Sequence, residues 1–351
     1  MTDSQKWLLF LIIGLGAWLT YLLAPILTPF VVSMTLAYLG DPLTDRLERY
    51  RLSRTLAVTV VFFTMTLVFV LILLWLIPQL ERQIESFIDS LPAYAQFLNE
   101  TAVPWLNRRF DLDIKPFDTQ SIVDMITSHW QTAGGTAQSL LSSLSHSGGV
   151  VMAWLMNLLL IPVVTFYLLR DWDNLMAKLH YLLPRRIAPT VAKLTNEFDT
   201  VLSAFLRGQF YVMLALGAIY SIGLGLVGLD LALLIGVTSG LLSFVPYLGT
   251  AIGIFSASLA ALLQFQDALH LFWVLAVFGI GQILEGSVLT PLLVGDKIGL
   301  HPVAVIFAVL AGGQLFGFMG ILLALPVASV IMVMLRHAHD WYKDSEFYSQ
   351  V

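Results

Sequence analysis

The sequence predicts an all-α, polytopic membrane protein with about eight membrane-embedded helices or hairpins. Only 12% of its 351 residues are charged, against roughly 25% in an average soluble domain, and 58% are hydrophobic. Charged residues are absent from long runs, among them 7–40, 208–229, 231–266 and 298–335. These runs lack the alternating polarity of outer-membrane β-strands, so helices are the expected spanning elements.

The composition also excludes several classes of function. The net charge of −5 offers no basic face to nucleic acid, and the absence of cysteine removes thiol catalysis and cysteine-based metal sites. The chain contains no Gly-x-x-x-x-Gly-Lys-Ser/Thr loop for ATP and no His-Glu-x-x-His or Gly-x-Ser-x-Gly motif. We therefore expect neither an enzyme nor a bound cofactor.

Two prolines divide the first apolar run of the chain. Pro25 and Pro29 interrupt 7–40, which is too long for one upright helix, so helices are expected near 7–24 and 28–40. The membrane-embedded part of the chain therefore begins with two helices.

One long stretch is hydrophilic, residues 79–148, and it follows a third helix expected to span 55–78 and to end at Pro78. Apolar residues recur in it at helical spacing, which predicts a small extramembrane domain with helices near 79–100 and 118–142.

Basic residues predict the orientation of the chain. Segments 41–54 and 170–207 hold ten of the 18 Lys and Arg residues, so both are expected in the cytoplasm. The N- and C-termini then also lie in the cytoplasm, and 79–148 lies outside. Pro184 and Pro189 are expected to divide 170–207 into two interfacial helices.

The C-terminal half contains a repeated pattern after a helix expected over 208–228. Stretches 231–265 and 298–335 each consist of two apolar halves that meet at an aromatic break rich in Gly and Pro. A single crossing, 268–293, separates them, so the two copies would have opposite orientations. Inverted repeats with broken helices are typical of secondary transporters, whose sites lie near the breaks.

The expected organisation therefore has six segments. They are 1–78 with the N-terminal membrane helices, 79–148 as the extramembrane domain, 149–169 as one membrane helix, 170–207 as a cytoplasmic linker, 208–335 as the transport core and 336–351 as a cytoplasmic tail.

Glu285 is the strongest candidate for a functional residue because it lies between charge-free runs 268–284 and 286–295. A carboxylate at that depth costs several kcal/mol unless it is paired, wetted or protonated. Gln282 precedes it by one helical turn and would share its face. The pair suits a site for H⁺ or Na⁺ as coupling ion. The alternatives are a glutamate at the membrane edge or a structural ion pair with a Lys or Arg, for which Lys297 is a candidate partner.

Uncharged groups at the breaks would complete a path for a substrate or ion. These candidates are Thr238, Ser239, Ser243, Pro246, Tyr247, Gly249, Thr250, Gly313 and Gln314. Pro291 and Asn157 are further candidates along the path. The alternative for the breaks is a kink whose hydroxyls bond to their own backbone, and for Asn157 an interhelical hydrogen bond.

Five short motifs occur in order along the chain. They are Phe166-Tyr167-Leu168-Leu169-Arg170-Asp171, Arg207-Gly208-Gln209, Val245-Pro246-Tyr247-Leu248-Gly249, Glu285 with Pro291, Gly295 and Gly299-Leu300-His301-Pro302, and Gly312-Gly313 with Leu315-Phe316-Gly317, Gly320 and Pro326. Together they resemble the autoinducer-2 exporter (AI-2E) family of bacterial membrane proteins, also called PerM-like permeases.

This resemblance implies a multi-pass transporter of the bacterial inner membrane that assembles as a homo-oligomer. It implies two alternative activities, export of the quorum signal autoinducer-2 and Na⁺(Li⁺)/H⁺ antiport. We expect a secondary transporter that exports a small polar solute with an ion gradient. Cation antiport is the second hypothesis, and a membrane scaffold whose 79–148 domain binds a partner is the third.

Overall fold

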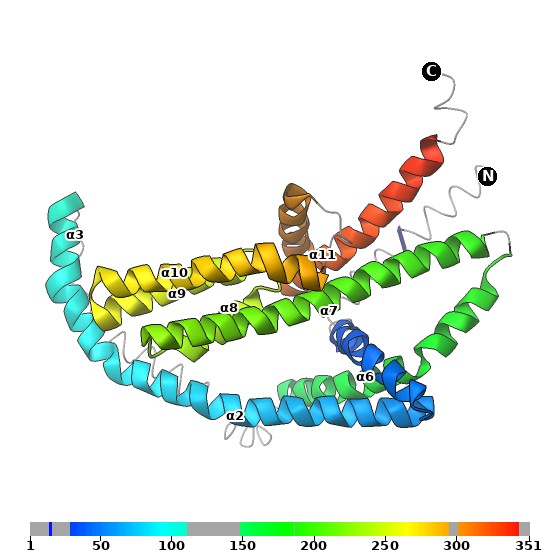
Figure 1. The fold of residues 1–351 in the computed structure, drawn as a ribbon, viewed down its shortest axis with the longest axis horizontal. Coiled ribbons are helices and arrows are strands. Elements are labelled where there is room, and N and C mark those ends of the chain that lie inside the picture. The colour runs from blue at the N-terminus through cyan, green and yellow to red at the C-terminus, as the bar shows by residue number, and fades with distance from the viewer. Residues whose placement is uncertain (1–13, 16–28, 111–147, 186, 295–300, 344–351) are drawn as a thin grey trace. The chain divides into compact units, whose positions relative to one another are not determined.

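The computed structural model describes residues 14–15, 29–110, 148–185, 187–294 and 301–343. Every regular element in these ranges is a helix, which confirms the all-α prediction (Figure 1). The predicted helix near 118–142 and, apart from residues 14 and 15, the one near 7–24 lie outside the described residues. The helices are one over residues 29–49, α2 (Arg54–Phe97), η1 (Leu98–Ala102), α3 (Val103–Phe110), α6 (Gly148–Leu182), α7 (Ala188–Val227), α8 (Ala232–Leu242), α9 (Leu248–Phe265), α10 (Ala268–Leu284), η2 (Glu285–Val294) and α11 (Pro302–Lys343).

Several of these helices are suited to a bilayer. Five helical stretches in the described part of the chain are long and apolar enough to cross a membrane, namely Arg54–Thr101, Ala188–Val227, Leu248–Phe265, Ala268–Val294 and Gly320–Asp340. Two shorter apolar helices, Ala232–Leu242 and Val303–Gly317, accompany them. The chain is therefore a polytopic helical membrane protein, as the charge-free runs predict.

The third predicted helix is longer than expected. Helix α2 continues without interruption through Pro78 and Pro92 for 44 residues, so the prediction that it ends at Pro78 and that a new helix begins at 79 is wrong. At 1.5 Å per residue the helix is about 66 Å long, more than twice the thickness of a hydrocarbon core. Only 6% of the most apolar stretch of this helix is buried within the protein, which is consistent with a surface that faces lipid.

The segment between the fourth and fifth membrane helices also differs from the prediction. Residues 170–207 do not form two separate interfacial helices, because α6 continues to Leu182 and α7 already begins at Ala188. The chain breaks at the predicted place. Pro184 lies in the turn between the two helices, and Pro189 occupies the first turn of α7, where its missing N–H costs no hydrogen bond.

The described helices belong to two compact units. The first comprises Met1–Thr66, Met156–Gly208 and Leu293–Val351, and the second comprises Leu67–Leu155 and Gln209–Leu292. We call them unit 1 and unit 2.

Polar contacts between helices hold unit 1 together. The Ser33 hydroxyl of helix 29–49 donates to the Ile161 carbonyl of α6 at 2.9 Å. The Arg54 guanidinium donates to the Leu169 carbonyl at 2.9 Å and to Asp41, Asp45 and Glu48 at 2.9–3.0 Å. Arg54 therefore joins the start of α2 to both α6 and the preceding helix.

Unit 2 packs α7, α8, α9 and α10 around a core of aromatic and small residues. Tyr220 and Phe278 are fully buried, and their ring centroids are 4.5 Å apart. Helix α10 begins at Asp267, whose side chain accepts from the His270 N–H at 2.9 Å. This hydrogen bond, together with one from the His270 ring, lowers the pKa of Asp267.

Both predicted broken stretches contain their break. Helices α8 and α9 are separated by Ser243–Tyr247, and α11 is kinked at Gly317, whose φ of 60° and ψ of −140° are outside the helical region. In α11 the backbones of Gly312 and Gly320 approach so closely that a side chain on either would overlap the other's carbonyl group. The broken form of both copies is thus confirmed, and their inverted orientation stays a prediction.

Candidate functional site

A strained turn separates α8 from α9 in unit 2. Tyr247, the last residue before α9, has a φ of 67°, which a residue with a side chain rarely adopts, and its side chain is exposed. Pro246 precedes it and supplies no N–H. The fixed conformation of this turn sets where α9 begins, and so where the residues of its first turn lie.

The first turn of α9 lies against the end of α8. The backbone of Gly249 is so close to the Ser239 carbonyl and to Ser243 that no side chain would fit. The Ser243 hydroxyl donates to the Ser239 carbonyl at 2.8 Å, and the Gln209 amide of α7 donates to the Ser243 carbonyl. The hydroxyl of Ser243 therefore bonds to its own helix, as the structural alternative predicts, while its carbonyl is held by a third helix.

Four side chains from three helices form a continuous polar network beside this turn. The Gln282 amide on α10 donates to the Thr250 hydroxyl on α9 at 2.9 Å and also to Glu285. The Thr250 hydroxyl is 3.3 Å from the hydroxyl of Tyr220 on α7, within hydrogen-bonding distance. We call Tyr220, Thr250, Gln282 and Glu285 the polar network.

The two ends of the polar network differ in burial. Tyr220 is fully buried and Thr250 is 8% exposed, whereas Gln282 and Glu285 are only partly buried. Within the described residues Glu285 forms no ion pair, and its Oε1 atom accepts no hydrogen bond there. Lys297, its candidate partner, lies outside the described residues. The network thus leads from a buried hydroxyl to an accessible carboxylate.

Glu285 also marks a change in helical geometry. Helix α10 ends at Leu284, and the π-helical segment η2 begins at Glu285 and runs to Val294 with Pro291 inside. π-helical geometry is rare in proteins and, where it interrupts an α-helix, is frequently found at functional sites. Pro291 is exposed and cannot donate a backbone hydrogen bond, which frees one carbonyl group near the carboxylate.

Chemically, the polar network can bind a proton or a cation. The Gln282 amide uses both of its hydrogens, one on Thr250 and one on the carboxylate, as long as Glu285 is ionised. A protonated Glu285 would instead be a donor, so its preferred partner would be the amide oxygen of Gln282. The protonation state of one carboxylate is therefore linked to the hydrogen bonds of two other helices.

The other predicted path residues are not members of the polar network. Thr238 is exposed on α8, and its hydroxyl bonds to the Leu234 carbonyl of its own helix. Gly313 and Gln314 lie on α11 in unit 1, and the Gln314 side chain is exposed. Asn157 lies in α6, and its side chain is outside the described part. The roles assigned to these residues stay predictions.

The sequence reasoning missed Tyr220. The available signal was a tyrosine within the apolar run of α7, and it is weak because Tyr211 occurs in the same run. Only the packing of α7 against α10, where Tyr220 lies against Gly281, places its hydroxyl beside Thr250.

Helices suited to a membrane, two broken stretches and an intramembrane carboxylate in a polar network are together typical of membrane transport proteins. The particular family follows from comparison. The profile of the AI-2E family transporters matches residues 8–340, and the chain belongs to this family.

Three relatives illustrate the range of similarity. The chain is 30% identical over 313 residues to "Putative transport protein YrrI" of Bacillus subtilis, covering 89% of this chain and 86% of the relative. It is 26% identical over 340 residues to "Putative permease PerM" of Escherichia coli, covering 97% and 94%. It is 24% identical over 332 residues to a "Sodium-lithium/proton antiporter" of Halobacillus andaensis, covering 92% of each.

Proposed function

We propose that the chain is a secondary transporter of the bacterial inner membrane. It exports a small polar solute of the autoinducer-2 type and draws on a proton or sodium gradient. One observation carries the proposal: Glu285 lies in a hydrogen-bonded network with Gln282, Thr250 and Tyr220, and it forms no ion pair within the described residues. Ionisable residues within membrane helices mark substrate and ion pathways in many transport proteins, which supports this role for Glu285.

In this proposal Glu285 alternates between ionised and neutral forms. The ionised form accepts from Gln282, and the amide in turn holds Thr250 of α9. Proton binding turns one Glu285 oxygen into a donor while the other can still accept, so the Gln282 amide can rotate to present its oxygen to the new O–H, and its hydrogen bond to Thr250 is then replaced. Because Thr250 lies in the first turn of α9, three residues after the strained Tyr247, this change acts on the turn between α8 and α9. The carboxylate thereby couples proton binding to the broken hairpin.

Exchange of Na⁺ or Li⁺ for H⁺ is the second candidate. The free Oε1 of Glu285 and the hydroxyl oxygen of Thr250 are hard ligands of the kind that monovalent cations bind. The similarity to the sodium-lithium/proton antiporter of Halobacillus andaensis supports the same reaction. In this case the cation and the proton would compete for Glu285.

Further parts of the proposal come from the sequence pattern and the family. The distribution of Lys and Arg supports cytoplasmic termini and an external 79–148 segment. The family resemblance supports a homo-oligomer in the membrane.

Purified protein in liposomes tests the proposal and separates the two candidates. A pH gradient is imposed across the liposome membrane. The movement of a labelled furanosyl solute and the pH inside the liposomes are then followed with and without Na⁺ or Li⁺. Solute movement that depends on the gradient supports export, whereas cation-dependent proton movement without solute supports antiport. If neither solute nor cation moves faster than in protein-free liposomes, both candidates are wrong.

A further inference from the structure

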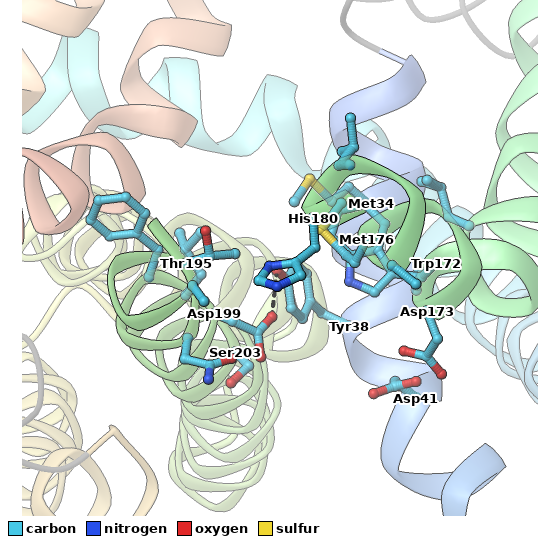
Figure 2. Close-up of a pocket in the computed structure, with 18 of the residues that line it drawn as sticks. Met34, Tyr38, Asp41, Trp172, Asp173, Met176, His180, Thr195, Asp199 and Ser203 are labelled. Atoms are coloured by element: carbon cyan, nitrogen blue, oxygen red, sulfur yellow. Dashed lines mark hydrogen bonds between the residues drawn. The ribbon is translucent and has the colours of Figure 1, made fainter. Parts of the chain in front are cut away.

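A large cavity lies in unit 1 among helix 29–49, α6 and α7 (Figure 2). Its volume is about 950 Å³, which is at the upper end of the range for sites that hold drug-sized molecules. All residues that line it belong to unit 1, whereas Glu285 and its network belong to unit 2. The sequence analysis did not identify this cavity, because its lining comes from three segments that are far apart in the chain.

The charges that line the cavity are mainly negative. Asp41, Asp173 and Asp199 contribute three carboxylates, against the guanidinium of Arg207 and the imidazole of His180, which is cationic only when protonated. The Arg207 Nε donates to the Ser203 carbonyl on its own helix at 3.0 Å, so part of its donor capacity is already used. An anion would therefore meet net repulsion, and a cation net attraction.

The three carboxylates are not equally compensated. Asp41 and Asp173 both lie near Arg54, at 3.0 and 3.9 Å. Asp199 forms no ion pair within the described residues, and its hydrogen-bond donor is the Tyr38 hydroxyl at 3.0 Å. Figure 2 shows the side chains of Tyr38 and Asp199 directed toward each other in the cavity. Asp199 is thus the carboxylate with the most capacity for an incoming cation.

Burial raises the pKa of Asp41, and the nearby Asp45 adds to the shift despite the hydrogen bond from Arg54. Asp199 and Asp173 are the two exposed carboxylates of the lining, whereas Asp41 is only partly exposed and is bonded to Arg54.

Most of the rest of the lining is apolar or aromatic, with Thr195, Asn196 and Ser203 as polar members. Met34, Trp172 and Met176 line the cavity, as do several leucines of α6 and α7. Aromatic faces attract organic cations, and methionine side chains adapt to irregular apolar ligands. Groups of three or more acidic or histidine side chains able to hold a metal ion do not occur among the described residues. The ligand chemistry is therefore that of an organic cation rather than a metal ion.

We propose that the cavity of unit 1 binds amphiphilic organic cations, with a protonated amine on Asp199 and an apolar body against Trp172, Met34 and Met176. The ammonium group donates to the Asp199 carboxylate beside Tyr38. This binding site is separate from the polar network and does not depend on the proposed transport reaction.

Calorimetric titration of the purified protein in detergent tests the proposal. Three probes share one apolar body and differ in charge: phenylbutylamine, phenylbutanol and phenylbutyrate, each also titrated into empty micelles. The amine is expected to bind tightest and the carboxylate weakest. Equal affinity for the amine and the alcohol would overturn the proposal, because it would mean that the lining charge plays no part.

Three substitutions locate the site. Asp199→Asn is expected to weaken amine binding about five- to tenfold, the loss expected for a partly exposed charged hydrogen bond, and to leave the alcohol unaffected. Tyr38→Phe removes the donor to Asp199 and is expected to preserve or strengthen amine binding, because the carboxylate gains a free acceptor position. Asp230→Asn makes the same change as Asp199→Asn at an exposed position outside the cavity lining and is expected to change nothing.

The two cavity variants distinguish a specific site from a collapsed cavity. A collapsed cavity would bind both the amine and the alcohol more weakly, and it would do so in both variants. That result would contradict the proposal. So would an Asp199→Asn protein that unfolds like the wild type and binds the amine with undiminished affinity.

Discussion

Replacing Gly281 by alanine is expected to disrupt the packing that positions the polar network. A Cβ atom at this position would lie 3.0 Å from Cζ and from the hydroxyl oxygen of Tyr220 and closer still to Cε1, well inside the normal carbon–carbon contact of about 3.5–4.0 Å. The Tyr220 ring cannot withdraw easily, because it is fully buried and packs against Phe278. Overpacking of this kind typically costs about 1–3 kcal/mol.

Gly279 provides a matched control on the same helix. A Cβ there would meet nothing within 4 Å. Both substitutions gain the same roughly 0.5–1 kcal/mol of helix propensity, so the difference between them isolates the steric cost, about 1–3 kcal/mol. Unfolding of the two variants in one detergent, followed by circular dichroism, measures this difference. Equal stability of Gly281→Ala and Gly279→Ala would refute the packing of α7 against α10 described above.

Three further substitutions test individual contacts. Tyr220→Phe removes the hydroxyl beside Thr250 and should lower the free energy of unfolding by about 0.5–1.5 kcal/mol, measured in the same unfolding assay; an unchanged value would mean that the hydroxyls are not bonded. Asp267→Ala should lower the melting temperature at neutral pH. The difference in melting temperature should vanish in acid, because a carboxylate whose folded pKa is depressed loses its stabilising contribution as the pH falls through that pKa. A difference that does not change with pH would contradict the stabilising role of the Asp267 carboxylate. Arg54→Ala leaves three carboxylates and one carbonyl of α6 without their shared donor, and it should lower the free energy of unfolding in denaturant by about 1–3 kcal/mol. A stability equal to that of the wild type would exclude the role of Arg54 in joining the helices.

Charge and proline patterns predicted which helices occur better than they predicted where each helix begins and ends. Charge-free runs indicated where helices suited to a bilayer occur because a bilayer tolerates few charges, a constraint that acts on composition alone. Prolines were less reliable. Pro184 lies at a real break, whereas α2 runs through Pro78, because neighbouring groups in a membrane protein can satisfy the backbone that a proline frees. Whether a given proline ends a helix depends on contacts that its local sequence does not contain.

The candidate site shows a similar division. Glu285 and Gln282 were identified together because a charge inside an apolar run is unusual and their spacing of three residues places them on one helical face. Thr250 was one of several hydroxyl residues near a break, and nothing in the sequence distinguished it from Thr238, whose hydroxyl bonds to its own helix. Tyr220 could not be predicted, because its contact with Thr250 depends on the tertiary packing of α7.

The cavity of unit 1 could not be predicted from the sequence either, because it also depends on tertiary packing. Asp41, Asp173 and Asp199 lie in segments that the sequence assigns to the cytoplasmic side, where isolated aspartates are ordinary surface residues. Their convergence on one cavity follows only from the packing of three helices.

The most direct test of the central claim is proton-coupled transport by Glu285→Gln in liposomes with an imposed pH gradient. Glutamine keeps the shape and the hydrogen-bonding capacity of the side chain but cannot release a proton. Glu85→Gln, the same change at an exposed position of α2, serves as control. The account predicts that Glu285→Gln folds, inserts and no longer responds to the gradient, while Glu85→Gln transports like the wild type. Gradient-driven transport by Glu285→Gln at the wild-type rate would contradict it.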